Sequence, residues 1–179
     1  MGKRVLVAYA SRMGWTKEIA EEVGAELRSR GVEVDVLPCS ADPKPDGYDA
    51  VVIGSALYVR RWDKAASTYL KQYAPVLGER STWLFQSGPC GEGAETEQLD
   101  PPRAVAKQMK KHGLRSPRTF GGRLDVEHAT GPLSRWMGKD GPLSGDFRDW
   151  KLIRKWAQDI ANELTTERSP RRAHDKSDG

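Results

Sequence analysis

Two hydroxyl residues bracket a glycine in the short segment 11–16, which reads Ser-Arg-Met-Gly-Trp-Thr. The segment follows an apolar, β-favouring run at 5–9 and precedes a stretch with helical periodicity at 17–29. The first turn of a helix carries unpaired N–H groups and a partial positive charge, and both favour a bound anion. The spacing therefore indicates a phosphate-binding loop. In an ordinary connection Thr16 would merely cap the helix, and the segment alone leaves that alternative open.

The motif differs from two common nucleotide loops. No Gly-Lys-Ser/Thr follows Gly14, so this is not a Walker A loop, and the glycine-rich dinucleotide fingerprint is missing as well. The spacing Ser11-x-x-Gly14-x-Thr16 instead resembles the phosphate loop of flavodoxins. That loop binds the single phosphate of FMN through hydroxyls and backbone N–H groups.

Two further loops rich in small and hydroxyl residues follow apolar runs. Segment 55–62 comes after the run 50–54 and contains Tyr58 and Trp62, while segment 87–93 comes after the run 82–86. Ligands of open parallel sheets bind at the carboxyl ends of the strands. The three loops together therefore predict a three-sided site for a planar, phosphorylated ligand.

Strands and helices alternate along the chain. We expect strands at 5–9, 32–37, 50–54, 82–86 and 118–124, and helices at 17–29, 64–77, 100–112 and 150–164. Gly31 is placed to end the first helix, and Asp63 and Asp149 are placed to cap later ones. This pattern predicts an α/β fold: a doubly wound parallel sheet with helices on both faces.

Length and composition limit the number of domains and the kinds of segment that the chain can contain. The 179 residues suit a single domain over 1–164, with an insertion at about 125–147 and a charged, Ser- and Pro-bearing tail at 165–179 that we expect to be disordered. No apolar run approaches the ~20 residues that cross a bilayer. Met1-Gly-Lys-Arg leads straight into a strand, which leaves no room for a signal peptide.

Charge and cysteine usage point to a cytoplasmic protein without nucleic acid as a partner. The net charge is +4, the pI is about 9.1, and the basic residues are scattered. Cys39 and Cys90 are far apart and form no CxxC, and the three histidines show no metal-ligand pattern, so no metal site is expected.

Longer motifs make the resemblance specific. The opening motif is accompanied by three others: Val52-Ile-Gly-Ser-Ala-Leu-Tyr58, Phe120-Gly-Gly-Arg-Leu124, and Trp136-Met-Gly-Lys-Asp-Gly141 followed by Asp149-Trp150. Together they resemble the menaquinone-dependent protoporphyrinogen oxidase type of flavodoxin-domain protein over most of 3–164. The resemblance implies a flavodoxin-like five-stranded sheet in the order 2-1-3-4-5.

The resemblance also implies the cofactor and the residues that bind it. The cofactor is FMN or, as an alternative with the same tricyclic ring on a phosphorylated ribityl chain, the deazaflavin F420. The implied phosphate residues are Ser11, Arg12, Met13, Gly14, Trp15 and Thr16. The implied ring residues are Ser55, Ala56, Leu57, Tyr58, Ser87, Gly88, Pro89, Cys90, Gly91 and Glu92. Tyr58 and Trp62 either stack on the ring or pack in the core, and Cys90 is interpreted as a space-filler.

The implied function is an FMN-dependent oxidoreductase. It would pass electrons between a small hydrophobic, protoporphyrinogen-like substrate and a quinone or similar acceptor, with no catalytic side chain assigned. The alternatives are an electron carrier without its own substrate, a deazaflavin-binding relative and a non-catalytic domain. The insertion is short and polar here, whereas the oxidase type has a long apolar one. A weak peripheral membrane contact through Trp136 is a further hypothesis.

Overall fold

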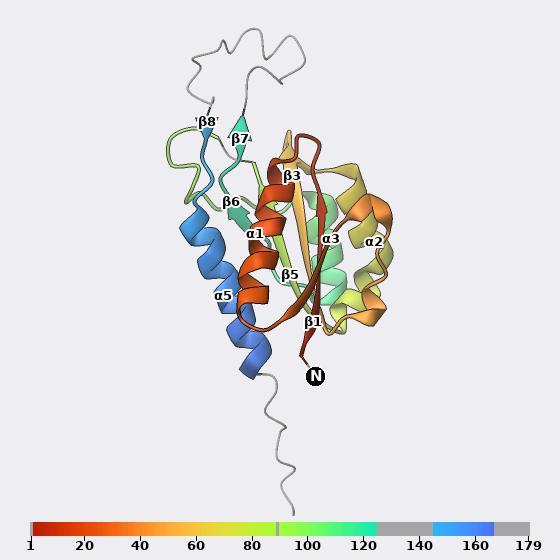
Figure 1. Cartoon of the computed structure of the whole chain (residues 1–179). Coiled ribbons are helices and arrows are strands. Elements are labelled where there is room, and N and C mark those ends of the chain that lie inside the picture. The colour runs from red at the N-terminus through yellow and green to blue at the C-terminus, as the bar shows by residue number, and fades with distance from the viewer. Residues whose placement is uncertain (1, 89, 125–144, 167–179) are drawn as a thin grey trace, which may run out of the picture.

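A computed structural model describes residues 2–88, 90–124 and 145–166. Five parallel strands form the central sheet in the order β2-β1-β3-β5-β6 (Figure 1). They are β1 (Arg4–Ala10), β2 (Glu33–Pro38), β3 (Ala50–Tyr58), β5 (Ser81–Ser87) and β6 (Arg118–Phe120). Counting parallel strands along the chain, this is the predicted order 2-1-3-4-5, and the predicted fold class is confirmed.

Helices cover both faces of the sheet (Figure 1). Helices α1 (Trp15–Ser29) and α5 (Trp150–Thr166) pack on one face, and α2 (Lys64–Gly78) and α3 (Arg103–His112) pack on the other. In β1 the side chains alternate between the two cores: Val5 and Val7 face the first pair of helices, and Leu6 and Ala8 face the second. From Val5 to Ala8 the strand is apolar because both of its faces are buried.

The predicted N-caps are confirmed at two helices. Asp63 Oδ1 accepts a hydrogen bond from Ala65 N at 2.9 Å, and Asp149 Oδ1 accepts one from Lys151 N at 2.8 Å. The C-cap of α1 is Arg30 and not the predicted Gly31, which comes next with φ of 79°, the left-handed conformation that glycine adopts without strain. Two short 3₁₀ turns, η1 (Cys39–Ala41) and η2 (Pro45–Gly47), connect β2 to β3.

The predicted loop at 55–62 is wrong. Strand β3 continues to Tyr58 and folds back into a two-residue antiparallel strand, β4 (Arg61–Trp62), through a tight turn at Val59 and Arg60. Both turn residues have positive φ, 49° and 58°. Such hairpin turns normally carry Asn or Gly, and Val59 and Arg60 offer no such turn signal.

The predicted fifth strand at 118–124 is split in two. Its first part, β6, joins the main sheet, whereas β7 (Arg123–Leu124) pairs with β8 (Gly145–Asp146) in a separate antiparallel ribbon. At Gly121 a Cβ would fall 1.9 Å from the Phe147 carbonyl oxygen. The chain therefore leaves the sheet at a place where another backbone approaches too closely for a side chain.

Several expectations lie outside the described residues. They are the course of the insertion from 125 to 144, with Trp136, and the state of the tail from 167 onward. Helix α5 itself extends to Thr166, two residues beyond the expected end. Among the described helices, none combines the length and the apolar composition that a bilayer span requires.

Candidate functional site

The three predicted loops meet at the carboxyl edge of the sheet, the upper end in Figure 1. Two hydrogen bonds connect them directly. Thr16 Oγ1 lies 2.9 Å from Ser87 Oγ, which joins the first loop to the third. Arg12 N donates to Tyr58 Oη at 3.3 Å, which joins the first loop to the second. The structure thus brings together the segments that the sequence analysis assigned to one site.

The first loop presents backbone donors that lack partners. Ser11 Oγ accepts a hydrogen bond from Gly14 N at 3.0 Å, and Gly14 turns the chain into α1 with φ of 86°. The first backbone bond of the helix runs from Glu18 N to the Gly14 carbonyl at 3.1 Å. Within the described part of the chain, four N–H groups of this turn have no acceptor: those of Met13, Trp15, Thr16 and Lys17. Four free donors at a helix N-terminus are suited to an anion such as phosphate.

Thr16 does not cap the helix, so the capping role considered for it is wrong. The residue lies inside α1, whose N-cap is Gly14, and no side chain caps this helix. Thr16 is 2 % exposed and its hydroxyl bonds to Ser87, itself buried at the end of β5. The hydroxyl pair therefore fixes the loop against the centre of the sheet.

Arg12 crosses from the first loop to the start of α2. Its Nε donates to Asp63 Oδ2 at 2.9 Å, and its guanidinium lies 4.5 Å from the centre of the Tyr58 ring. One face of Tyr58 is thus covered by a cation, while burial raises the pKa of its hydroxyl. Arg12 consequently holds the hairpin against the loop.

The second loop supplies one wall of the site. Ser55 is fully buried, and its Oγ accepts a hydrogen bond from Asp63 N at 2.9 Å, which supports the hairpin from inside. Ala56 is buried, whereas Leu57 and Tyr58 are partly exposed. Leu57 packs closely on Gly88 of the third loop, where an added Cβ would lie 2.7 Å from Leu57 Cβ. Gly88 therefore lets the two loops meet.

Trp62 belongs to the core and not to the site surface. It is 5 % exposed and packs in the core beneath α2, and its Nε1 donates to Gln86 Oε1 at 3.0 Å. The stacking role considered for Trp62 is therefore wrong. The buried Gln86 amide has hydrogen-bond partners at both ends, because its Nε2 also donates to Leu99 O at 2.9 Å.

The third loop continues from Gly88 to Glu92. The Cys90 thiol points to the Gly88 carbonyl, with Sγ and O 3.6 Å apart, and burial raises its pKa to about 11. A thiol of this kind stays protonated at neutral pH, consistent with a space-filling residue. Gly91 has φ of 108°, Glu92 is exposed, and Pro89 lies outside the described residues.

Two arginines near the site were missed by the sequence analysis. Arg148 donates to the Trp15 carbonyl at 3.3 Å, and the guanidinium of Arg123 lies 5.7 Å from the centre of the Trp15 ring. More than a hundred residues separate each arginine from Trp15. Neither spacing nor periodicity signals contacts of that range.

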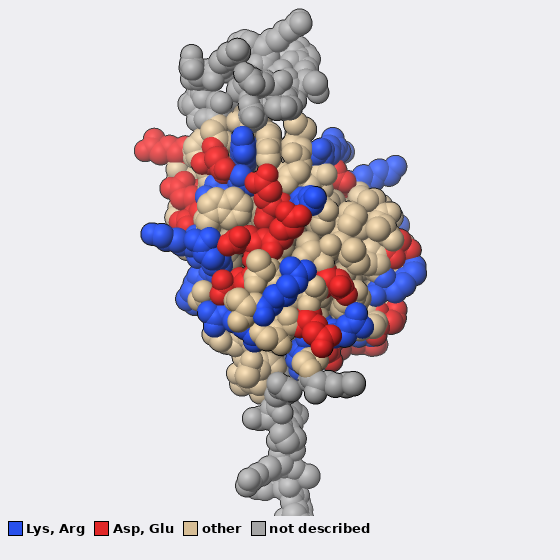
Figure 2. Space-filling model, in the orientation of Figure 1, with Lys and Arg blue, Asp and Glu red and all other residues tan. Residues whose placement is uncertain are grey.

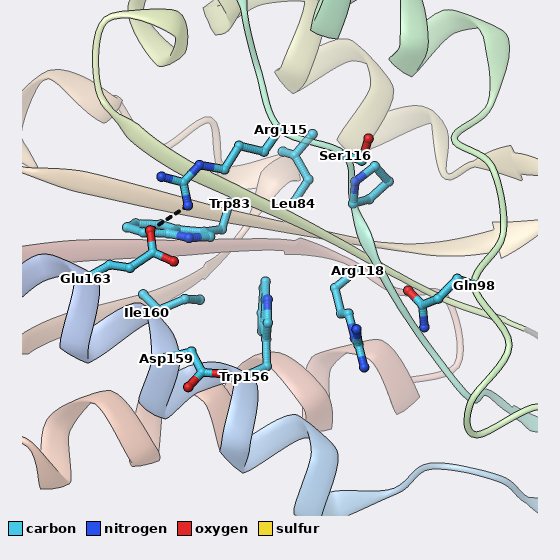
Figure 3. A pocket seen from close by; sticks show the side chains of 11 residues that line it. Trp83, Leu84, Gln98, Arg115, Ser116, Arg118, Trp156, Asp159, Ile160 and Glu163 are labelled. Atoms are coloured by element: carbon cyan, nitrogen blue, oxygen red, sulfur yellow. Dashed lines mark hydrogen bonds and ion pairs between the residues drawn. The ribbon is translucent and has the colours of Figure 1, made fainter.

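A separate hollow of about 360 Å³ lies lower on the sheet, between β5 and α5 (Figure 3). β6 pairs with β5 only from Phe85 onward, so Trp83 and Leu84 border the hollow. Arg115 closes one end, stacked 5.3 Å from the centre of the Trp83 ring and paired with Glu163 at 2.6 Å. Of the predicted site residues that the structure describes, none lines this hollow.

The fold and the three-loop site define a flavodoxin-type protein, and comparison with known families agrees. A family model described as "Flavodoxin domain" matches residues 6–130, and the chain belongs to this family. Over 84 residues the chain is 30 % identical to the protoporphyrinogen IX dehydrogenase [quinone] of Escherichia coli strain K12. That match covers 46 % of this chain and 46 % of the relative, so it spans about half of the relative's length.

Solved structures share the fold. A flavodoxin from the domain Archaea is 18 % identical, with a TM-score of 0.60 over 90 % of this chain and 99 % of that one. A mutant flavodoxin of Fusobacterium nucleatum, solved with bound flavin mononucleotide, is 16 % identical, with a TM-score of 0.56 over 93 % of this chain and 98 % of that one. At these identities the likeness is one of fold.

Proposed function

We propose that this protein binds FMN at the carboxyl edge of the sheet and acts as a flavin-dependent oxidoreductase. The observation that carries the proposal is the set of four N–H groups around Gly14 that have no acceptor among the described residues, which suits a terminal phosphate. When bound, the flavin would supply the one- or two-electron redox chemistry, and the protein would supply binding and orientation.

The proposed contacts follow the geometry of the loops. The turn from Ser11 to Thr16 would hold the phosphate, while Leu57 and Tyr58 would line one side of the ring and Gly88 and the residues from Cys90 to Glu92 the other. Ser55 and Ser87 are buried beneath the site. They support it through their hydrogen bonds to Asp63 and Thr16. Arg12 is engaged by Asp63, so backbone groups would carry most of the phosphate recognition.

The proposed substrate is a small hydrophobic molecule of the protoporphyrinogen kind, with a quinone or similar electron acceptor. Support comes from the name of the Escherichia coli relative, which shares about half its length with this chain. FMN is preferred to a deazaflavin because a structural neighbour was solved with flavin mononucleotide. We place this activity in the cytoplasm.

Absorption spectroscopy of the purified protein tests the cofactor. We expect a flavin spectrum, release of a cofactor with the mass of FMN, and quinone-dependent oxidation of protoporphyrinogen under anaerobic conditions. A carrier would instead hold a stable semiquinone and show no turnover. A colourless protein that does not take up added FMN would overturn the proposal.

A matched pair of glycine variants tests the loop itself. Gly14→Ala puts a side chain at φ of 86°, whereas Gly47→Ala introduces one at an open position with ordinary φ. Because the left-handed conformation costs an alanine about 1 kcal/mol, the empty turn of Gly14→Ala should relax away from φ of 86°. Restoring the turn when the ligand binds should then weaken FMN binding about fivefold. Gly47→Ala should bind FMN as the parent does.

A further inference from the structure

A buried arginine, Arg148, contacts the first turn of helix α1. The side chain of Arg148 is 3 % exposed and lies between β8 and α5. Its Nε and Nη2 donate to the two carboxylate oxygens of Asp146 at 2.8 and 2.6 Å, and its guanidinium lies 4.6 Å from the centre of the Trp150 ring. The arginine is therefore fixed in one orientation, as a bidentate pair and a stacked ring require.

The remaining nitrogen of this arginine is directed at the phosphate turn. Nη1 donates to Glu18 Oε2 at 2.6 Å and to the Trp15 carbonyl at 3.3 Å. Trp15 is the first residue of α1, and its carbonyl shares a peptide unit with the Thr16 N–H, which is one of the four donors without an acceptor among the described residues. A cation bound to the Trp15 carbonyl fixes this peptide unit, and with it the direction of the donors beside it.

Arg148 also pairs with Glu18, which places a negative charge in the first turn of α1. A carboxylate there repels a phosphate held at the helix N-terminus. Pairing with Arg148 offsets that charge. Without the arginine, the turn would keep its carboxylate and lose the compensating cation.

We infer that Arg148 is a positioning residue that makes flavin binding depend on the phosphate. It orients the Trp15 end of the loop and neutralises Glu18, so that the turn accepts a phosphorylated flavin in preference to the same ring without phosphate. The inference rests on the proposed function, because it assumes that a flavin occupies the three-loop site.

A purely structural role predicts a different result. If Arg148 only fastens α5 to α1, its loss should weaken every ligand of the site to a similar degree. Riboflavin carries the same ring as FMN and no phosphate, so the ratio of the riboflavin Kd to the FMN Kd isolates the phosphate contribution. A general loss of structure leaves this ratio unchanged.

The experiment titrates apoprotein with FMN and with riboflavin and follows the quenching of flavin fluorescence. We expect Arg148→Met to lower the Kd ratio about tenfold, the effect of losing a charge-assisted contact. Arg148→Lys should recover part of the ratio, since it keeps the charge and loses the bidentate geometry.

Glu18→Gln gives a second test that does not depend on how well Arg148→Met folds. Glu18 is half exposed, so its substitution leaves the core intact. Removal of its charge should raise the Kd ratio about threefold. In Arg148→Met/Glu18→Gln the ratio should recover partway toward the parent value, because the unpaired carboxylate is gone.

Arg154 provides the matched control. It also joins α5 to α1, through Glu22 at 2.9 Å, but it lies farther along both helices from the phosphate turn. Arg154→Met should leave the Kd ratio unchanged while lowering the melting temperature slightly.

The outcomes separate the inference from the function on which it rests. If the parent protein binds neither flavin, or binds both equally, the proposed phosphate site is wrong. If the parent prefers FMN and the ratio is unaffected by both Arg148→Met and Glu18→Gln, the role assigned to Arg148 is wrong. An equal fall in the ratio for Arg154→Met would also overturn it.

Discussion

At the scale of single residues, the site depends on small groups placed where a larger one would not fit. Gly88 and Leu57 meet at the rim, and deeper in the sheet Gly54 lies directly under the Phe85 ring. A Cβ at Gly54 would fall 2.0 Å from Phe85 Cζ. Close-packed interiors do not absorb such an overlap without displacement.

Gly54→Ala therefore tests the packing beneath the site. Phe85 also packs against Phe120 and Trp156, with ring centres 5.9 Å away in each case, so the ring cannot shift freely. We expect a loss of about 1–3 kcal/mol in the free energy of unfolding, as for other overpacked cores. Urea denaturation measures it, and Gly47→Ala, at an open position, should change stability little.

The two cysteines give a prediction about pH. Burial raises the pKa of Cys39 to about 12 and that of Cys90 to about 11, so both thiols are protonated at pH 8. Because the thiolate is the reactive form, alkylation by iodoacetamide should be slow at pH 8 and should accelerate as the pH rises toward 11. Cys90, with the lower pKa, should react first.

Unfolded protein is the reference for this measurement. In denaturant both thiols should alkylate at the rate of a model thiol. Rapid alkylation of Cys90 in the native protein at pH 8 would contradict the space-filling role and point to redox chemistry in the third loop.

At the scale of elements, the β3–β4 hairpin is the strained part of the site. Val59 is 94 % exposed and adopts φ of 49°, a conformation that is costly for a β-branched side chain. Arg60 follows with φ of 58°. Tight two-residue turns with positive φ at both positions favour Asn-Gly.

The double variant Val59→Asn/Arg60→Gly should therefore stabilise the protein. Nothing packs on Val59, so its removal costs no buried contact, and relief of backbone strain should contribute about 1 kcal/mol. Thermal unfolding would show this as a higher Tm. If Tm is unchanged or lower, the turn is not strained in the native protein.

The elements also show what the sequence could and could not predict. The alternation of strands and helices follows from local periodicity, the two N-caps from the single residues Asp63 and Asp149, and the strand order from the resemblance to flavodoxins. The hairpin was missed because Val59-Arg60 carries no turn chemistry. The split after β6 was missed because the backbone that approaches Gly121 there, at Phe147, is distant in the sequence. The three loops could be assigned to one site because ligands of parallel sheets bind at the carboxyl ends of the strands. The role proposed for Arg148 could not be predicted, because it rests on contacts with residues far away in the sequence.

At the scale of the whole molecule, charge is divided between the two helical layers. Helices α2 and α3 contain no Asp or Glu and carry six exposed cations, namely Lys64, Lys71, Arg103, Lys107, Lys110 and Lys111. Within the described ranges, none of the six forms an ion pair or a hydrogen bond through its side chain. On the opposite layer acidic side chains gather over α1 with basic ones beside them (Figure 2), and several of these form ion pairs, such as Arg154 with Glu22.

This division predicts that the protein meets an anionic surface with its α2–α3 face. Replacing Lys107, Lys110 and Lys111 by Gln lowers the net charge from +4 to +1, and so does replacing Lys17, Lys151 and Lys155 on the other layer. Lys17 and Lys155 are each paired with an acidic residue, so their loss removes less attraction to a distant anion. On a cation-exchange column the α3 variant should therefore elute at lower salt than its partner of equal charge. Coelution would show that net charge alone governs binding and that the α2–α3 face has no preference for anions.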